Sequence, residues 1–358
     1  MDNKCHIRSS NIEFLRIISM IMILSLHSFT WNRATGNDGH IHNLSIGVLF
    51  DYYRESLCIC AVNIFILISG YFGIRWKLKS ILNFIFQVYF WALGIYVLLV
   101  VLGKTNYSNN VFFQRLNCLI GDWWFVEAYL GLYLLAPLLN AFVDKVKKKK
   151  LLIWVIIFII FEIYSELMGS KRNFDRGYNT LAFCGIYMTG RLLFLYQDKL
   201  QEFKHRTFSY IFFLLYLLTA MIISYLALYQ LIGKGHDFMS VQKSFAFSYS
   251  NPLIIIEAIC LFLVFHSMKF SNKLVNYIAS SIFAVYLLHL HPNIKHLYYS
   301  YCGQLYNESF MYHFIMLGCL FLCIVFISVF IDKIRLLFFQ WLYQKFEHLV
   351  QNKWNTNR

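Results

Sequence analysis

Charged side chains are scarce in this sequence. Asp, Glu, Lys and Arg together account for 14% of its 358 residues, against about 25% in soluble domains. Hydrophobic residues make up 59% and aromatic residues 19%. They gather in runs of about 20 residues, the length of a helix that spans a hydrocarbon core. The composition therefore excludes a soluble globular domain and predicts an all-α, polytopic membrane helical bundle.

Proline is also rare, with Pro137, Pro252 and Pro292 as the three in the whole sequence. Transporters built from inverted repeats characteristically contain helices broken by glycine or proline at matching positions of two halves. Neither matching breaks nor an internal repeat is visible here. This weakens, without removing, the alternative that the protein is a glycan or lipid transporter or flippase with no chemistry of its own.

Recognisable ligand-binding motifs are missing as well. The nine cysteines are scattered, and the close pair Cys58 and Cys60 has no second ligand pair of the kind that zinc requires. No glycine-rich phosphate loop and no serine-hydrolase elbow occurs. We therefore expect no metal, and we expect any chemistry to reside in polar side chains within the spans.

The apolar runs predict about ten transmembrane helices in a single domain covering residues 1–358. Their approximate bounds are 12–31, 56–74, 80–102, 123–143, 150–168, 178–196, 208–231, 249–268, 277–297 and 310–331. Residues 332–358 form a basic, aromatic-rich tail of the kind that lies on a membrane surface as an amphipathic helix. We read the first run as a retained span, because no small-residue cleavage site follows it.

Basic residues between the runs predict the orientation. With the N-terminus in the cytoplasm, twice as many lysines and arginines fall on the cytoplasmic side as on the outer side, so both termini are expected inside. Lys171 and Arg172, on the outer side, go against this trend. The net charge of +14 is explained by topology and anionic membrane lipids rather than by nucleic acid. The expected location is the plasma membrane, or inner membrane, with multiple passes.

The first run, residues 11–31, carries ionisable groups that are costly in a bilayer and by default mark a functional site. Arg16 and His27 are eleven positions apart, which in an α-helix is three turns plus about 20°, and roughly 16 Å along the axis. Both side chains therefore project from nearly one face. The alternative is that Arg16 snorkels to the headgroups and His27 sits at the far interface.

Other polar and aromatic residues sort by depth in the predicted topology. Near the cytoplasmic ends of spans lie Arg16, Ser69, Tyr71 and Arg191. In the outer half lie His27, Trp123, Trp124, Glu127, His289 and His291, with Asn63 near the middle of its span. An anionic cofactor would approach the first group and an acceptor the second. Structural alternatives remain open: interfacial anchoring for the tryptophans and histidines, a local ion pair for Glu127, and small-residue packing for Ser69 and Gly70.

Four passages together resemble acyltransferase family 3, the bacterial integral-membrane acyltransferases that include polysaccharide O-acetyltransferases. The passages are EFLRIISMIMILSLHSF, VNIFILISGYF, WWFVEAYLGLYLLAPLL and FAVYLLHLHP, spread in this order from Glu13 to Pro292. Glu13 stands where the family often has aspartate, which keeps the carboxylate. The resemblance implies acyl-CoA, in particular acetyl-CoA, as donor and a sugar hydroxyl as usual acceptor. It also implies that His27 and Arg16 are the functional pair.

On this basis we expect a membrane-bound O-acetyltransferase that acts on a cell-surface polysaccharide or its lipid-linked precursor. His27 would be the general base, and Glu127 or another carboxylate would orient it. Arg16 would hold a CoA phosphate or stabilise the oxyanion. The remaining expected contacts are Arg191, Ser69 and Tyr71 with the cofactor, and Trp123, Trp124, His289 and Asn63 with the acceptor. A covalent acyl-histidine and a purely structural role in a glycan-assembly complex stay open.

Overall fold

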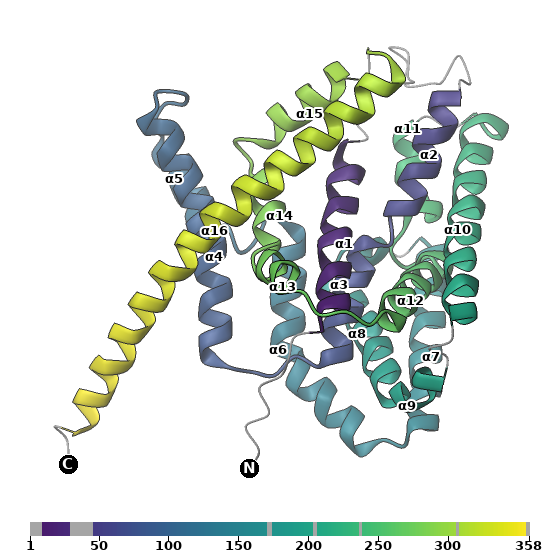
Figure 1. Ribbon diagram of the computed structural model, residues 1–358, viewed down its shortest axis with the longest axis horizontal. Coiled ribbons are helices and arrows are strands. Elements are labelled where there is room, and N and C mark those ends of the chain that lie inside the picture. The colour runs from purple at the N-terminus through teal and green to yellow at the C-terminus, as the bar shows by residue number, and fades with distance from the viewer. Residues whose placement is uncertain are drawn as a thin grey trace.

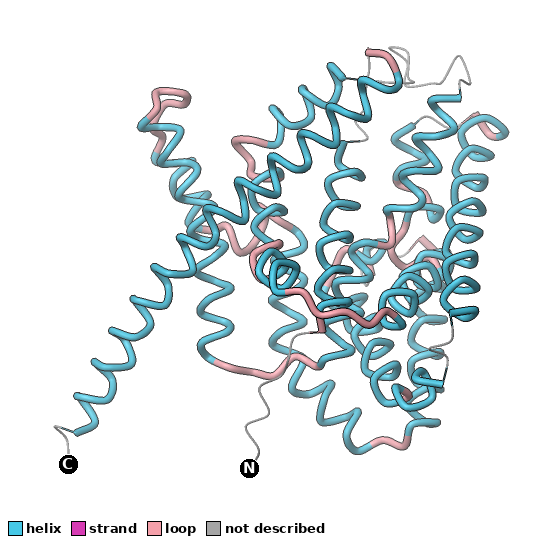
Figure 2. The backbone as a smooth tube through the Cα atoms, viewed as in Figure 1, coloured by secondary structure: helices cyan, strands magenta, loops and turns pink. Residues whose placement is uncertain are grey.

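The computed structural model of the protein describes residues 9–28, 46–169, 174–202, 206–235, 238–305 and 308–355. Within these ranges all the regular elements are helices, which confirms the all-α prediction (Figures 1 and 2). Seven described segments are long and apolar enough to cross a membrane. They are Ser10–Ser28, Ile46–Phe72, Leu78–Val101, Trp124–Lys145, Thr207–Gly233, Phe245–Ser267 and Phe310–Leu349. The protein is therefore a multi-pass membrane protein by length and composition of its helices.

These segments correspond to α1 (Ser10–Ser28), α2 with α3 (Ile46–Cys58, Ala61–Phe72), α4 (Leu78–Val101), α6 (Trp124–Lys145), α10 with η2 (Arg206–Leu228, Tyr229–Gly233), η3 with α12 (Phe245–Phe247, Pro252–Ser267) and α16 (Phe310–Asn355). The shorter elements are α5 (Asn109–Leu116), α9 (Gln197–Glu202), η1 (Asp175–Gly177) and α11 (Phe238–Gln242). Each of the seven overlaps a predicted span. Residues 29–31 of the first predicted span lie outside the described residues.

The other three predicted spans have different outcomes. Residues 150–168 and 178–196 are helical, as α7 (Lys148–Leu167) and α8 (Thr180–Leu195). Residues 277–297 do not form one helix, and this prediction is wrong. The chain there is divided into α13 (Lys273–Ala279), α14 (Phe283–His289) and α15 (Lys295–Leu305). The second break falls at Pro292, because proline lacks an N–H and restricts the residue before it.

Helix α1 lies in the middle of the bundle (Figure 1). It packs against α2, α3, α12, α13, α14 and α15, so its side chains face protein on several sides. Asn11 helps to hold this position, because its Nδ2 donates to the carbonyl oxygens of Phe265 and Met268 at the end of α12, both at 3.0 Å. Because α1 is surrounded by other helices, its polar side chains can face cavities inside the bundle.

The long helix α16 crosses the outside of the bundle diagonally (Figure 1). It continues through Asp332 without a break, so the predicted tail is an extension of the last span as far as Asn355. Asp332 and Arg335 are fully buried and form a bidentate ion pair, at 2.9 and 3.0 Å. Gln87 of α4 donates to the same carboxylate at 2.8 Å. This polar cluster anchors α16 to α4.

Replacing Asp332 with alanine is expected to destabilise the protein by about 3–5 kcal/mol, because it leaves the Arg335 guanidinium buried and unpaired. Thermal unfolding of the purified protein in detergent measures the effect. Gln344→Ala, at an exposed position of the same helix, is the matched control and should change stability little. Equal midpoints for the two variants would contradict the anchoring role of the cluster.

Candidate functional site

Arg16 and His27 both lie on the unbroken helix α1, as their spacing requires. Arg16 is near the helix start, where its guanidinium is 3.4 Å from the Glu13 carboxylate one turn before it. About a third of the Arg16 side chain is exposed and Glu13 is nearly buried. The pair leaves the guanidinium accessible from one side while its charge is partly balanced.

His27, at the other end of α1, contacts a second histidine from the broken segment. Its Nδ1 is 3.0 Å from Nε2 of His289, the last residue of α14. His289 Nδ1 lies 2.6 Å from the carbonyl oxygen of Val285. A carbonyl oxygen only accepts, so His289 Nδ1 carries the hydrogen and donates it. His289 is 1% exposed, and such burial favours neutral rings.

This chain of hydrogen bonds determines the tautomer of His27. A neutral His289 that is protonated on Nδ1 has a lone pair on Nε2, so His27 Nδ1 must donate to it. His27 Nε2 then carries a lone pair, and it makes no hydrogen bond with a described residue. The arrangement can accept a proton at one defined atom of His27.

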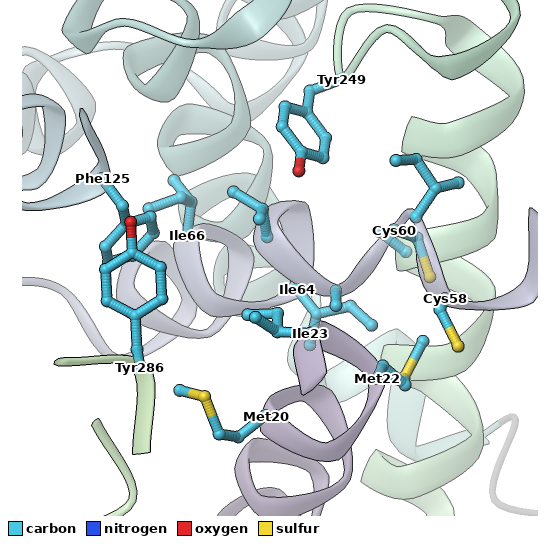
Figure 3. Close-up of a cluster of buried hydrophobic side chains, with 14 of the residues drawn as sticks. Met20, Met22, Ile23, Cys58, Cys60, Ile64, Ile66, Phe125, Tyr249 and Tyr286 are labelled. Carbon is cyan, nitrogen blue, oxygen red and sulfur yellow. The ribbon is translucent and has the colours of Figure 1, made fainter. Parts of the chain in front are cut away.

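His27 borders a narrow pocket with a volume of about 20 Å³. The pocket walls are mostly apolar and aromatic. Figure 3 shows five of the lining residues: Met20, Ile23, Phe125, Tyr249 and Tyr286. A cavity of 10–15 Å³ holds about one water molecule, so the pocket has room for a small group beside the imidazole. We call it the histidine pocket.

A second polar group of the histidine pocket, besides His27 Nε2, is the hydroxyl of Tyr286. It is buried beside the backbone of Phe125, and its O–H donates to no described residue. A buried tyrosine hydroxyl usually finds a partner, and each exception calls for an explanation. Because Tyr286 lines the same pocket as His27, a ligand that enters the pocket would meet a hydrogen-bond donor as well as the imidazole.

Two of the predicted acceptor contacts, Trp124 of α6 and Asn63 of α3, lie at or behind the wall of the histidine pocket. Trp124 lines it and stacks on Tyr249, with ring centroids 5.8 Å apart and planes at 24°. Asn63 does not line the pocket; its Nδ2 donates to the carbonyl oxygen of Tyr249 at 2.9 Å and so holds that residue in place. Trp124 is therefore a wall of the pocket and Asn63 a support behind it.

Arg16 borders a second and larger cavity, of about 240 Å³, which we call the arginine cavity. Its lining is more polar and includes Ser69, Gln87, Tyr129 and Ser280. The Ser69 hydroxyl lies 3.3 Å from that of Tyr129. The structure thus brings Arg16 and Ser69, two of the predicted cofactor contacts, to one cavity.

The other two predicted cofactor contacts lie elsewhere. The Tyr71 hydroxyl is 2.8 Å from Nε2 of His266 on α12. Arg191 lies over the ring of Phe194, at 5.0 Å, and against Gly73. Neither lines the arginine cavity, so the predicted cluster of Arg16 with Arg191 does not form among the described contacts.

The crossing of α3 with α8 explains the glycine of the Ser-Gly-Tyr segment. A Cβ at Gly70 would lie 2.2 Å from the backbone oxygen of Tyr187, and one at Gly190 would lie 2.3 Å from that of Leu67. The two helices approach so closely that only hydrogen fits at these positions. The small-residue alternative therefore describes Gly70, whereas Ser69 faces the arginine cavity.

Two predicted residues of the outer group are placed differently from the expectation. Glu127 is exposed on α6, and His289 rather than Glu127 holds His27 Nδ1. Trp123 is 1% exposed and packs beside His291, with ring centroids 6.0 Å apart, instead of lining the pocket. His291 itself donates from Nε2 to the carbonyl oxygen of Ala92, at 3.1 Å. These two side chains support the chain break after α14.

The loop before Trp123 is held by an ion pair between Arg115 and Asp122, at 2.9 Å. Burial raises the pKa of the Asp122 carboxyl above its ordinary value, and the Arg115 guanidinium opposes that rise. The pair fixes the start of α6, from which Trp124 and Phe125 reach the histidine pocket. Within the described part of the chain, no three His, Cys, Asp or Glu side chains converge as metal ligands would.

Several residues of the two cavities carried little signal in the sequence. Phe65, Phe125, Phe283 and Tyr286 stand in the passages quoted above, which was the available clue, but nothing in their spacing marks them as cavity residues. Tyr249 lies outside those passages and carried no such signal. Their convergence depends on packing between α1, α3, α6 and α14.

The fold and site together define a multi-pass helical membrane protein with a pocketed, hydrogen-bonded histidine suited to proton transfer. The chain belongs to acyltransferase family 3: the family model described as an acyltransferase domain matches residues 9–331. This confirms the resemblance inferred from the four passages. No curated protein and no solved structure matches the chain. The protein is therefore a membrane acyltransferase.

Proposed function

We propose that the protein transfers an acetyl group from acetyl-CoA to a hydroxyl of a cell-surface polysaccharide or its lipid-linked precursor. The reaction would take place in the plasma membrane, or inner membrane, with both termini in the cytoplasm. The observation that carries the proposal is the unpartnered Nε2 of His27 in the histidine pocket, together with membership of an acyltransferase family.

In the proposed reaction, Nε2 of His27 takes the proton of the acceptor hydroxyl as its oxygen attacks the thioester carbonyl. The new C–O bond forms a tetrahedral intermediate, and its collapse breaks the C–S bond. The proton then passes from the imidazolium to the departing thiolate, which leaves as CoA thiol. His289 is a positioning residue, because it keeps the hydrogen of His27 on Nδ1.

Arg16 is suited to the nucleotide end of the donor. Its guanidinium is always charged and pairs well with phosphate, and it borders a cavity large enough for part of a ligand. It lies roughly 16 Å along α1 from His27 by helical rise, so it cannot also stabilise an oxyanion formed there. We therefore assign Arg16, with Ser69 and Gln87, to the donor.

Tyr286 is the best-placed donor for the oxyanion, since its buried O–H donates to no described residue. Tyr286→Phe is expected to lower kcat by about 10²–10³-fold, the usual effect of removing one oxyanion donor, with little change in the KM for acetyl-CoA. Steady-state kinetics with the purified protein measure this. Because the ring remains, packing is kept, and an unchanged kcat would remove Tyr286 from the mechanism.

The direct test supplies purified protein in lipid nanodiscs with acetyl-CoA and candidate glycan acceptors. Release of free CoA thiol that depends on the acceptor, with a mass gain of one acetyl group on the glycan, is the expected result. A transporter would move the glycan across the bilayer without consuming acetyl-CoA. Comparison of surface glycans from wild-type and deletion cells, by mass, then identifies the modified acceptor.

A further inference from the structure

The histidine pocket and the arginine cavity share part of their walls. Phe65 of α3, Phe125 of α6 and Phe283 of α14 line both. The Phe125 ring lies 6.0 Å from that of Phe283 and 6.5 Å from that of Phe65, between ring centroids. These three residues, which we call the phenylalanine wall, separate the two spaces.

The two spaces differ greatly in size. The arginine cavity measures about 240 Å³ and the histidine pocket about 20 Å³. If the donor enters from the Arg16 side, its thioester must pass the phenylalanine wall for the carbonyl carbon to approach His27. The free space beyond the wall, about 20 Å³, is on the scale of one water molecule or one methyl group, so each further methylene of an acyl chain must displace side chains.

The wall is braced by further aromatic rings. Phe283 stacks on Phe84, at 5.7 Å and 27°, and Phe125 stacks on Tyr129, at 5.6 Å and 13°. Inserting a methylene between close-packed rings costs free energy, because the rings must leave their packed positions. Phe84 and Tyr129 line only the arginine cavity, so they support the wall from the donor side without bounding the histidine pocket.

We propose that the phenylalanine wall restricts the transferred acyl group to two carbons and is therefore the determinant of acyl-chain specificity. The inference rests on the proposed function and assigns it a donor class. Each methylene beyond acetyl must displace one of the three rings or remain in the arginine cavity, where the carbonyl is out of reach of His27. Longer chains are thus excluded by volume rather than by charge.

The experiment compares acetyl-CoA, butyryl-CoA and hexanoyl-CoA as donors for the wild type, Phe65→Ala and Phe283→Ala, with free thiol release as readout. The wild type is expected to prefer acetyl over butyryl by about 100-fold or more in kcat/KM, in line with the selectivity of apolar pockets. Each alanine variant should raise the butyryl-to-acetyl ratio by about 10-fold or more. Phe283→Leu and Phe65→Leu, which remove less volume, should shift it in the same direction.

Phe213→Ala is the matched control, because it removes the same side chain from an exposed position of α10 that lines neither cavity. It is expected to keep the wild-type ratio between the two donors. Wild-type ratios in all Phe65 and Phe283 variants, or equal use of hexanoyl-CoA by the wild type, would overturn the specificity role and leave acyl transfer intact. Absence of thiol release from every donor by the wild type would overturn the proposed function, and this inference with it.

Discussion

His27→Ala is expected to lower the rate of acyl transfer by about 10²–10⁴-fold, the range that general-base catalysis contributes. The reason is geometric: in the proposed reaction Nε2 of His27 is the one atom in the histidine pocket poised to accept the hydroxyl proton. Binding of acetyl-CoA should be little changed, because the donor contacts lie around Arg16 in the other cavity. Single-turnover kinetics and donor-binding measurements on purified protein separate the two effects.

The control for this prediction is His296→Ala, which removes an exposed histidine of α15. A second pair of variants tests the positioning role of His289. Glutamine at position 289 offers an oxygen to His27 Nδ1 and should retain more activity than alanine, which offers none. If His27→Ala keeps normal transfer at normal protein levels, His27 is not the base; if both His289 variants behave alike, His289 does not set the tautomer.

Arg16→Ala is expected to raise the KM for acetyl-CoA by about 10–100-fold, corresponding to about 1.5–3 kcal/mol for a hydrogen bond to a charged group. Arg16→Lys should recover part of the loss, because lysine restores the charge but not the planar two-pronged contact. Initial rates over a range of donor concentrations give the measurement. kcat should change less than KM, since Arg16 is remote from His27.

The decisive comparison uses acetyl-pantetheine, which lacks the nucleotide and its phosphates, as an alternative donor. With this donor the wild type and Arg16→Ala should have similar kinetics, because the group that Arg16 is proposed to hold is missing. Lys269→Ala, which removes an exposed cation after α12, serves as the charge control with acetyl-CoA. A loss of equal size with both donors would show that Arg16 acts on something other than the phosphates.

The class of this protein and its two leading candidate residues were accessible from sequence because they depend on local rules. A run of about 20 apolar residues specifies a helix across a bilayer, and a helical repeat of 3.6 residues places positions 16 and 27 on one face. The four passages led to the family for the same reason, since each is a contiguous segment. The prediction of one span from local pattern was wrong at residues 277–297. This apolar run contains serines at 280 and 281 and a proline at 292, and it divides into three helices.

The tertiary structure alone decided which residues meet. His289 is 262 positions from His27 in the chain, yet its Nε2 determines which nitrogen of His27 is free. Glu127 has the charge to orient a histidine but is exposed, and Arg191 contacts Phe194 and does not line the arginine cavity. The sequence by itself determined a helical membrane acyltransferase with Arg16 and His27 on one helix. The division between a donor cavity and a narrow pocket, with three phenylalanines between them, arises from the packing of α1, α3, α6 and α14, because contacts between helices depend on how their faces fit and not on their periodicity.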